Sequence, residues 1–204
     1  MSPFTNERAA FQALKIAVEQ DEALRADIEK ALKELLGRFS TAIRENRFVV
    51  GGALELILVA ALRAAGVDAQ HVGVEEERID IKLEKGGFSV KGHFSRSGGA
   101  IRLINTLGES EETKWETATL FVIHGVGFGY ADPELIPEEQ VERVKDALVL
   151  KYKVVRRFLS AHPHYLINLS IPPLLSDVSS SELVSRTLAR EILQRTSRLK
   201  DYID

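Results

Sequence analysis

Hydrophobic residues recur at helical spacing in the N-terminal part of the chain. The apolar positions of one stretch are Leu24, Ile28, Leu32, Leu35, Leu36, Phe39 and Ile43. This stripe is typical of an amphipathic helix, and Asp21 stands where its side chain can cap the first turn. An earlier helix is predicted near residues 4–19. We therefore predict an N-terminal helical pair over residues 1–47 that packs against the remainder of the chain.

The pattern changes after Phe48. Gly51 and Gly52 are expected to interrupt the chain, and residues 53–65 are typical of a buried helix that ends at Gly66. Short apolar or alternating runs then predict strands at residues 69–74, 78–84, 88–94, 118–124 and 165–171. Gly86 and Gly87 lie between the second and third of these runs, which predicts a hairpin.

Two more helices are predicted at residues 137–161 and 180–202. Residues 100–107 fit either a short helix or an irregular strand, and residues 125–129 are interpreted as the exit from the strand before them. This order predicts an α/β fold class (an α+β arrangement with a mixed sheet) flanked by helices. Residues 48–204 then form one compact domain that follows the helical pair.

Composition narrows the class of protein. The 204 residues are 45% hydrophobic and include no cysteine, which excludes a disulfide framework, a thiolate nucleophile and a Cys-ligated metal site. The same absence favours a cytoplasmic protein. The longest nearly apolar run, residues 51–65, is too short to span a bilayer and contains Glu55 and Arg63. We therefore expect no membrane partner.

Charge is distributed unevenly along a chain whose net charge is −3. Residues 78–105 contain six basic and two acidic residues, and residues 143–164 contain six basic and one acidic residue. Two basic segments in an acidic chain can form a local surface that faces phosphates. Ordinary solvated faces explain the same distribution, so the charge pattern leaves both interpretations open.

The predicted hairpin brings chemically useful side chains to one face. Asp80 alternates with apolar neighbours on the first strand, and Ser89 and Lys91 do so on the second. A loop of Lys85 and Gly86 would place Asp80 opposite Lys91, and a loop of Gly86 and Gly87 would place it opposite His93. A carboxylate beside a lysine suits metal-assisted hydrolysis of a phosphodiester. The plain alternative is a cross-strand ion pair on a solvated face.

Glu55 adds a second carboxylate. It is the only acidic residue of the apolar helix predicted before the strands, and it projects at the border of the apolar surface. A carboxylate in such a place needs a cation, a donor or a metal. A salt bridge to Arg63 or Lys91 is the ordinary solution, and a metal site beside the hairpin is the other.

These pieces together resemble the PD-(D/E)xK nuclease superfamily, which has the restriction-endonuclease-like fold, and the later ones are similar to segments of some type II restriction-type nucleases. The resemblance covers about residues 50–132. It rests on the helix GGALELILVAALRAAG, the strands RIDIKL and FSVKG, and the later segments IRLINTLG and WETATLFVIHGVGFGYADPEL. It implies a mixed sheet flanked by helices and Mg²⁺-dependent (or Mn²⁺-dependent) cleavage of DNA. Carried over, the metal-binding acids are Asp80 and Glu55, and the catalytic lysine is Lys91.

Two positions depart from the family pattern. Ser89 stands where the family usually has an acid two residues before the lysine, and Ile79 stands where a proline precedes the motif aspartate. A serine hydroxyl is not an anionic metal ligand. Either Glu55 completes the site, with Ser89 beside it, or the chain is a decayed nuclease that binds DNA without cleaving it.

The resemblance implies double-stranded DNA as the partner, and a homodimer would match the two-fold symmetry of a palindromic site. The residues expected to contact DNA are Arg78, Lys82, His93, Arg96, Arg102, Lys151, Lys153, Arg156 and Arg157. Those of the second basic segment fall on the helix predicted at residues 137–161. An interaction or scaffold protein with a merely solvated hairpin face is the remaining alternative.

Overall fold

The computed structural model describes residues 2–38, 44–72, 78–95, 98–104, 114–173 and 185–202. Its helices are α1 (Thr5–Gln20), α2 (Glu22–Arg38), α3 (Arg44–Ala64), α4 (Tyr152–Ala161) and α5 (Ser185–Leu193), with short 3-10 helices at Glu138–Gln140, Pro163–Tyr165 and Leu199–Tyr202. Its strands are β1 (Ala69–His71), β2 (Ile81–Leu83), β3 (Gly87–His93), β4 (Ala100–Ile104), β5 (Thr119–Ile123), β6 (Gly127–Ala131), β7 (Val141–Val144), β8 (Ala147–Lys151) and β9 (Leu166–Asn168).

The predicted N-terminal helical pair is confirmed as α1 and α2. Asp21 caps α2, because its Oδ1 accepts the backbone N–H groups of Ala23 at 2.9 Å and Leu24 at 3.0 Å. The apolar stripe of α2 is buried from Leu24 to Leu36, and its predicted continuation through Phe39 and Ile43 lies outside the described residues. The two helices therefore join the core through the face that the sequence pattern indicated.

The glycines at 51 and 52 do not interrupt the third helix. α3 runs through them from Arg44 to Ala64, although a glycine inside a helix costs about 1 kcal/mol relative to alanine. Val50, Ala53, Leu54 and Ile57 continue one buried stripe across this point. Burial of that stripe offsets the poor helix propensity, so the predicted helix start at residue 53 was wrong.

The main sheet has six strands in the order β1-β2-β3-β5-β6-β9. Neighbouring strands are antiparallel except for β3 and β5, which run parallel with Lys91 beside Phe121 and His93 beside Ile123. Parallel neighbours need a crossover connection, and the crossover here contains β4, which belongs to a second sheet of order β4-β8-β7. The expected mixed sheet with a central antiparallel hairpin is therefore confirmed.

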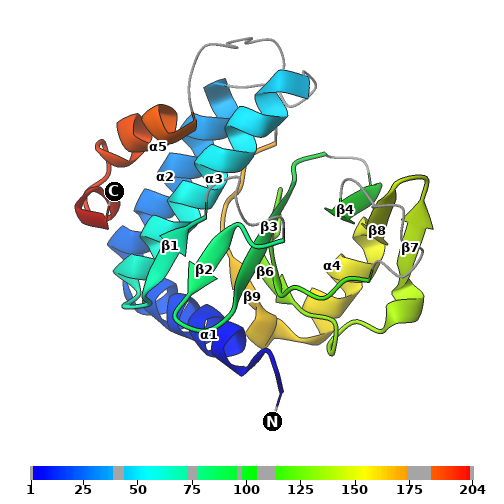
Figure 1. The fold of residues 1–204 in the computed structure, drawn as a ribbon. Coiled ribbons are helices and arrows are strands. Elements are labelled where there is room, and N and C mark those ends of the chain that lie inside the picture. Colours follow the sequence, from blue (N-terminus) through cyan, green and yellow to red (C-terminus); the bar gives the residue numbers. More distant parts are fainter. Residues whose placement is uncertain are drawn as a thin grey trace.

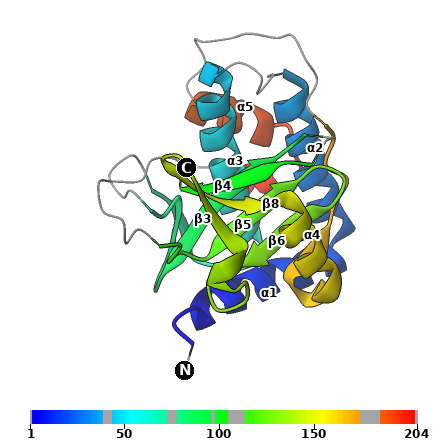
Figure 2. The same cartoon turned by 90° about the vertical axis from the view of Figure 1, so that its right-hand side faces the viewer.

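The main sheet lies between two unlike layers (Figure 1). α1, α2, α3 and α5 contribute to one apolar core, which covers one face of the sheet. The three-stranded sheet and α4 pack against the other face through a second core that includes Phe121, Ile123 and Leu150. Figure 2 shows the small sheet and α4 in front of the main sheet.

The helix predicted at residues 137–161 was wrong over its first half. Residues 141–151 form the hairpin β7–β8 instead, and α4 begins only at Tyr152. Lys145 adopts a positive φ of 55° in the connecting turn, and the run from Ala147 to Leu150 is buried throughout. A short, fully apolar run of this kind fits a covered strand better than an amphipathic helix.

Other predicted elements are shorter or different. β1 and β2 occupy parts of the predicted runs at residues 69–74 and 78–84, residues 100–104 form the strand β4, and β9 covers Leu166–Asn168. Residues 125–129 do more than leave a strand, since β6 begins within them at Gly127. The last predicted helix contains α5 and a separate 3-10 helix. Val74, residues 105–107 and residues 180–184 of these predictions lie outside the described residues.

Helix α1 ties the sheet together at two points. Glu7 is buried and accepts the backbone N–H of Gly87, the first residue of β3, at 3.0 Å. Arg8 makes a two-pronged contact to Asp132, with its Nε 2.8 Å from Oδ2 and its Nη2 2.9 Å from Oδ1. Both contacts use charged groups, so they are stronger than neutral hydrogen bonds. The first helix thereby anchors the hairpin that carries the candidate site.

Candidate functional site

The hairpin β2–β3 pairs as predicted but in a different register. Ile81 lies opposite Phe88 and Lys82 opposite Gly87, and the Leu83 N–H donates to the Gly86 carbonyl at 3.1 Å. The loop therefore consists of residues 84 and 85, and neither register expected from the sequence occurs. Gly86 adopts φ +79° at the end of this turn, and a Cβ on Gly87 would collide with the Ile81 carbonyl oxygen. The two glycines are thus needed after the turn rather than within it.

Asp80 lies just before β2 and reaches across to β3. Its Oδ2 accepts the backbone N–H of Val90 at 2.6 Å and the hydroxyl of Ser89 at 3.1 Å. The other edge of β3 is paired with β5, so the Val90 N–H faces the side on which β2 has already ended. The Asp80 carboxylate therefore accepts the hydrogen bond that the backbone of a neighbouring strand would otherwise accept. Oδ1 keeps its lone pairs free of protein donors within the described part of the chain.

Lys91 alternates with Ser89 and His93 on one face of β3. This is the face turned toward the small sheet, because Ser89 and Lys91 lie beside Thr119 and Phe121 in the parallel register. Lys91 is half-buried, and among the described residues its ammonium has no hydrogen-bond or ion-pair partner. Hence Asp80 and Lys91 do not form the cross-strand ion pair that was the plain alternative.

Glu55 is paired with a residue that the sequence did not suggest. Its Oε2 lies 2.9 Å from Nε2 of His71, at the end of β1, and both side chains are 20% exposed. The expected salt bridges of Glu55 to Arg63 or Lys91 do not form, and the Arg63 Nε donates to the Ala69 carbonyl at 2.7 Å instead. The residue after His71, Val72, donates its N–H to the Asp80 carbonyl at 3.1 Å. The pair of Glu55 and His71 lies on the side of the sheet that the helices cover, because His71 is opposite Ile81 of that core. Ser89, the side-chain partner of Asp80, is on the face turned toward the small sheet, and the two carboxylates share no partner in the described chain.

The basic residues expected to contact DNA occupy different environments. Arg102, Lys153, Arg156 and Arg157 are exposed on β4 and α4. Lys151 is exposed but paired with Glu142 across β7 and β8. On the far side of the hairpin Lys82 is exposed, and Arg78 is paired with Glu116 at 2.6 Å. Arg96 lies outside the described residues. The second basic segment thus spans a hairpin and a helix.

His93, one of the residues expected to contact DNA, is buried rather than exposed. It is 9% exposed and its ring stacks on Tyr152 with 4.6 Å between ring centroids. Burial lowers the pKa of His93 below the ordinary 6.5, since a desolvated imidazole disfavours the charged form. Its Nε2 has no hydrogen-bond partner within the described structure. A direct ionic contact of His93 with DNA is therefore not supported by its environment.

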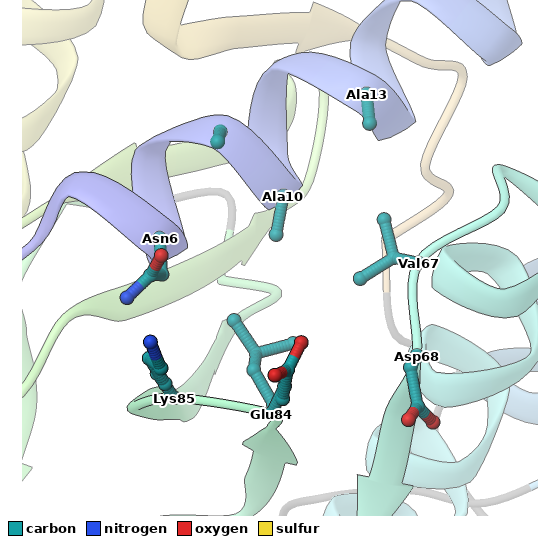
Figure 3. Close-up of a pocket in the computed structure, with 9 residues that line it drawn as sticks. Asn6, Ala10, Ala13, Val67, Asp68, Glu84 and Lys85 are labelled. Carbon is teal, nitrogen blue, oxygen red and sulfur yellow. The ribbon is translucent and has the colours of Figure 1, made fainter.

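A shallow groove of about 340 Å³ lies beside the hairpin turn, between α1 and the start of β1 (Figure 3). Ala10 and Ala13 of α1 face Val67 across it, and Asp68, Glu84 and Lys85 edge it. Neither Asp80 nor the candidate site residues of β3 line this groove. The groove is therefore separate from the place where Asp80 meets Ser89.

The donor set fits a magnesium ion only in part. Asp80 offers one carboxylate oxygen on a rigid strand end, and Mg²⁺ is commonly held by one or two carboxylates together with water and phosphate oxygens. Within the described ranges, no three His, Asp or Glu side chains come close enough together to hold a metal by themselves. A second acid would have to come from Glu55, whose carboxylate is partly exposed and has His71 as its partner.

Comparison with protein-family models, with curated proteins and with solved structures finds no match to this chain. In the described part of the chain, no helix combines the length and the apolar character that crossing a membrane requires. The fold and the side-chain geometry are therefore the basis for a functional proposal.

Proposed function

We propose that this protein is a Mg²⁺-dependent DNA endonuclease of the restriction type, with a restriction-endonuclease-like core. The observation that carries the proposal is the position of Asp80. Two donors from β3 fix its Oδ2 while Oδ1 stays available, and Lys91 follows on the same strand without an anionic partner among the described residues. A fixed carboxylate near an unpaired ammonium is an arrangement that phosphodiester hydrolysis can use.

Asp80 and Glu55 would hold the metal in this proposal, with Mn²⁺ as a possible substitute for Mg²⁺. When bound, the ion supplies charge stabilisation at the phosphate and a lowered pKa for a coordinated water. Lys91 would orient the attacking water and offset negative charge that develops on the phosphate. Ser89 cannot add a negative charge, and its hydroxyl keeps the Asp80 carboxylate in place.

Duplex DNA would lie against the exposed cations of β4 and α4. Arg102, Lys153, Arg156 and Arg157 are available for phosphates without first breaking an ion pair in the described structure. Lys151 would have to exchange Glu142 for a phosphate. Each phosphate contact releases counterions, so binding should weaken steeply as salt is raised. A homodimer would present two such surfaces to a two-fold symmetric site.

A second candidate function is DNA binding without cleavage on a decayed nuclease fold. Ser89 favours it, because a hydroxyl stands where an acid would complete the metal site. The bond from Val90 to Asp80 favours it as well, since it gives Asp80 a structural role that needs no metal. Both candidates share the DNA surface and differ only in whether Asp80 binds metal.

The decisive experiment is cleavage of plasmid DNA with Mg²⁺ or Mn²⁺, by the wild-type chain and by Asp80→Asn. We expect metal-dependent cleavage by the wild type and a loss of at least about 100-fold in the variant, in line with loss of a group that acts in the transition state. Calorimetric titration of metal gives the second readout. DNA binding without cleavage and without metal uptake would establish the decayed alternative, and salt-independent binding would exclude the proposed DNA surface.

A further inference from the structure

His93 is a buried polar side chain with an unused nitrogen. The residue is more than nine-tenths buried, and no atom within the described structure forms a hydrogen bond with its Nε2. A buried polar atom of this kind destabilises the fold unless a partner is supplied. The unpaired Nε2 therefore indicates a ligand or an ordered water that the protein alone does not provide.

The imidazole lies at the N-terminus of helix α4. Its ring stacks on Tyr152, the first residue of that helix. Its Cε1, the carbon bonded to Nε2, lies 4.0 Å from where a Cβ on Gly99 would be. The Gly99 carbonyl accepts the N–H of Tyr152 at 2.8 Å. Cε1 lies between the two ring nitrogens, so the imidazole sits beside the junction at which α4 begins.

The first turn of α4 has donors to offer. In this turn, only the N–H of Tyr152 is bonded to a neighbouring loop in the described structure. No side chain caps the helix at its N-cap residue, Lys151. The N–H groups that follow have no partner inside a helix, and the helix dipole places partial positive charge there. Lys153 adds an exposed ammonium in the same turn. Such a helix start favours an anion.

We propose that His93 and the first turn of α4 form a binding site for a single phosphate group. In its neutral form the imidazole can donate one hydrogen bond from Nε2 when the proton is on that nitrogen. The amides of the first turn and the ammonium of Lys153 supply the remaining donors. Gly98 and Gly99 place no side chain of their own at this junction.

The site lies close to the proposed catalytic centre. His93 follows Lys91 by two residues on the same face of β3, a separation of about 7 Å along a strand. A DNA strand carries one phosphate per nucleotide, so a phosphate next to the one that Lys91 addresses could occupy this site. Its identification as a DNA phosphate rests on the proposed function, whereas the phosphate site itself does not.

Titration of the protein with inorganic phosphate, followed by NMR without metal or DNA, tests the inference. We expect phosphate to shift the backbone amides of Lys153 and Val154 and the Nε2 resonance of His93, and sodium chloride at equal ionic strength to leave them unchanged. His93→Phe keeps a ring to stack on Tyr152 and removes both nitrogens, so it should weaken phosphate binding at least about fivefold. His164→Phe is the matched control, because His164 is an exposed histidine beyond the other end of α4.

Two results would overturn the inference: an absence of phosphate-specific shifts in the wild-type protein, or equal phosphate affinity in His93→Phe and wild type. The wild-type titration remains decisive if the variant does not fold. Phosphate binding by a protein that never cleaves DNA would refute the endonuclease proposal and leave the phosphate site in place. Metal-dependent cleavage by a protein that shows no phosphate-specific shifts would refute the phosphate site alone.

Discussion

Glu55 on α3 and His71 on β1 form a direct contact, with 2.9 Å between Oε2 and Nε2. Glu55 is the only acidic residue in the apolar half of α3, and this contact gives its carboxylate a partner that is not a metal. It also holds the Glu55 carboxylate next to the β1 stretch whose next residue, Val72, bonds to Asp80. The pair gives Glu55 a structural role that needs no metal, and its role as a metal ligand stays a proposal.

Replacement of Glu55 separates these interpretations. Glu55→Gln retains the shape and a hydrogen-bonding group, so we expect the melting temperature to change little. If Glu55 is a metal ligand, metal-dependent cleavage should fall by about 100-fold or more. His71→Gln removes the partner but leaves the acid, so it should reduce cleavage far less. Cleavage by Glu55→Gln at the wild-type rate would remove Glu55 from the site.

Two substitutions of Asp80 should differ in stability while both abolish cleavage. Asp80→Ala leaves the Val90 N–H without its acceptor, which should lower the free energy of unfolding by about 1–3 kcal/mol. Asp80→Asn keeps a carbonyl oxygen in the same place, so its loss of stability should be smaller. Urea denaturation of both variants measures the difference. Equal stability of the two would mean that the bond to Val90 contributes little.

The sequence predicted the elements whose patterns are long and periodic. α1, α2 and most of α3 follow their apolar stripes, and β5 follows the run at residues 118–124. The β7–β8 hairpin was missed for two reasons. Charged residues at 143 and 145 interrupt the apolar pattern of this region, and its apolar residues, together with the later residues 155 and 159, have helical spacing. The short apolar run of residues 147–150 fits a covered strand, and in the structure it pairs with β4.

The candidate site was predicted in composition but not in detail. Asp80, Ser89 and Lys91 do come from one hairpin, because alternation along β3 is a local property. The register was wrong because it depends on Gly87, whose close approach to Ile81 involves the opposite strand. The partner of Glu55 was missed because His71 is brought to it only by the packing of β1 against α3. No local pattern encodes such a contact.

The ion pair between the partly exposed Arg8 and the buried Asp132 should be among the more important polar contacts for stability. Asp132 is fully buried and also accepts the Tyr130 hydroxyl at 2.7 Å. The hydrogen bond to Asp132 raises the pKa of Arg8, and burial, together with Asp132, raises the pKa of Tyr130. Arg8→Ala would leave a buried carboxylate without its cation, which should cost about 3–5 kcal/mol.

Arg78→Ala is the matched control for Arg8→Ala. The pair of Arg78 and Glu116 is about 60% exposed on both sides, and such surface pairs contribute about 0–1 kcal/mol. Thermal or urea denaturation of the two variants gives the comparison. A loss of stability in Arg8→Ala no larger than that in Arg78→Ala would show that α1 is not anchored through Asp132.

The environment of His93 predicts a specific pH dependence of stability. Burial lowers the pKa of His93 below 6.5 in the folded protein, so above that pH both the folded and the unfolded chain hold it neutral. As the pH falls below 6.5, the unfolded chain takes up the proton first, and the free energy of unfolding decreases. As the pH is lowered in phosphate-free buffer, the free energy of unfolding should therefore decrease less steeply for His93→Phe than for the wild type. Parallel pH profiles would contradict this.

Ser89→Asp offers the most direct test of the missing acid. Ser89 is 7% exposed, and its Oγ is 3.1 Å from Oδ2 of Asp80. An aspartate there would place a second carboxylate against the first in a poorly solvated place, where the two negative charges repel each other. Without metal we expect the variant to be less stable than Ser89→Asn, which has nearly the same size and no charge.

Magnesium should reverse this order, because a divalent cation relieves the repulsion and gains a second carboxylate ligand. A ligand that binds only the folded state stabilises it by about 2.7 kcal/mol when its concentration is about 100 times its Kd. The melting temperature of Ser89→Asp should therefore rise with Mg²⁺ much more than that of the wild type, and that of Ser89→Asn should rise no more than that of the wild type. Cleavage by Ser89→Asp should increase in parallel if the wild-type site is limited by the missing acid. A melting temperature of Ser89→Asp that is insensitive to Mg²⁺ would mean that Asp80 and residue 89 do not face a metal position, and the decayed, DNA-binding alternative would then be preferred.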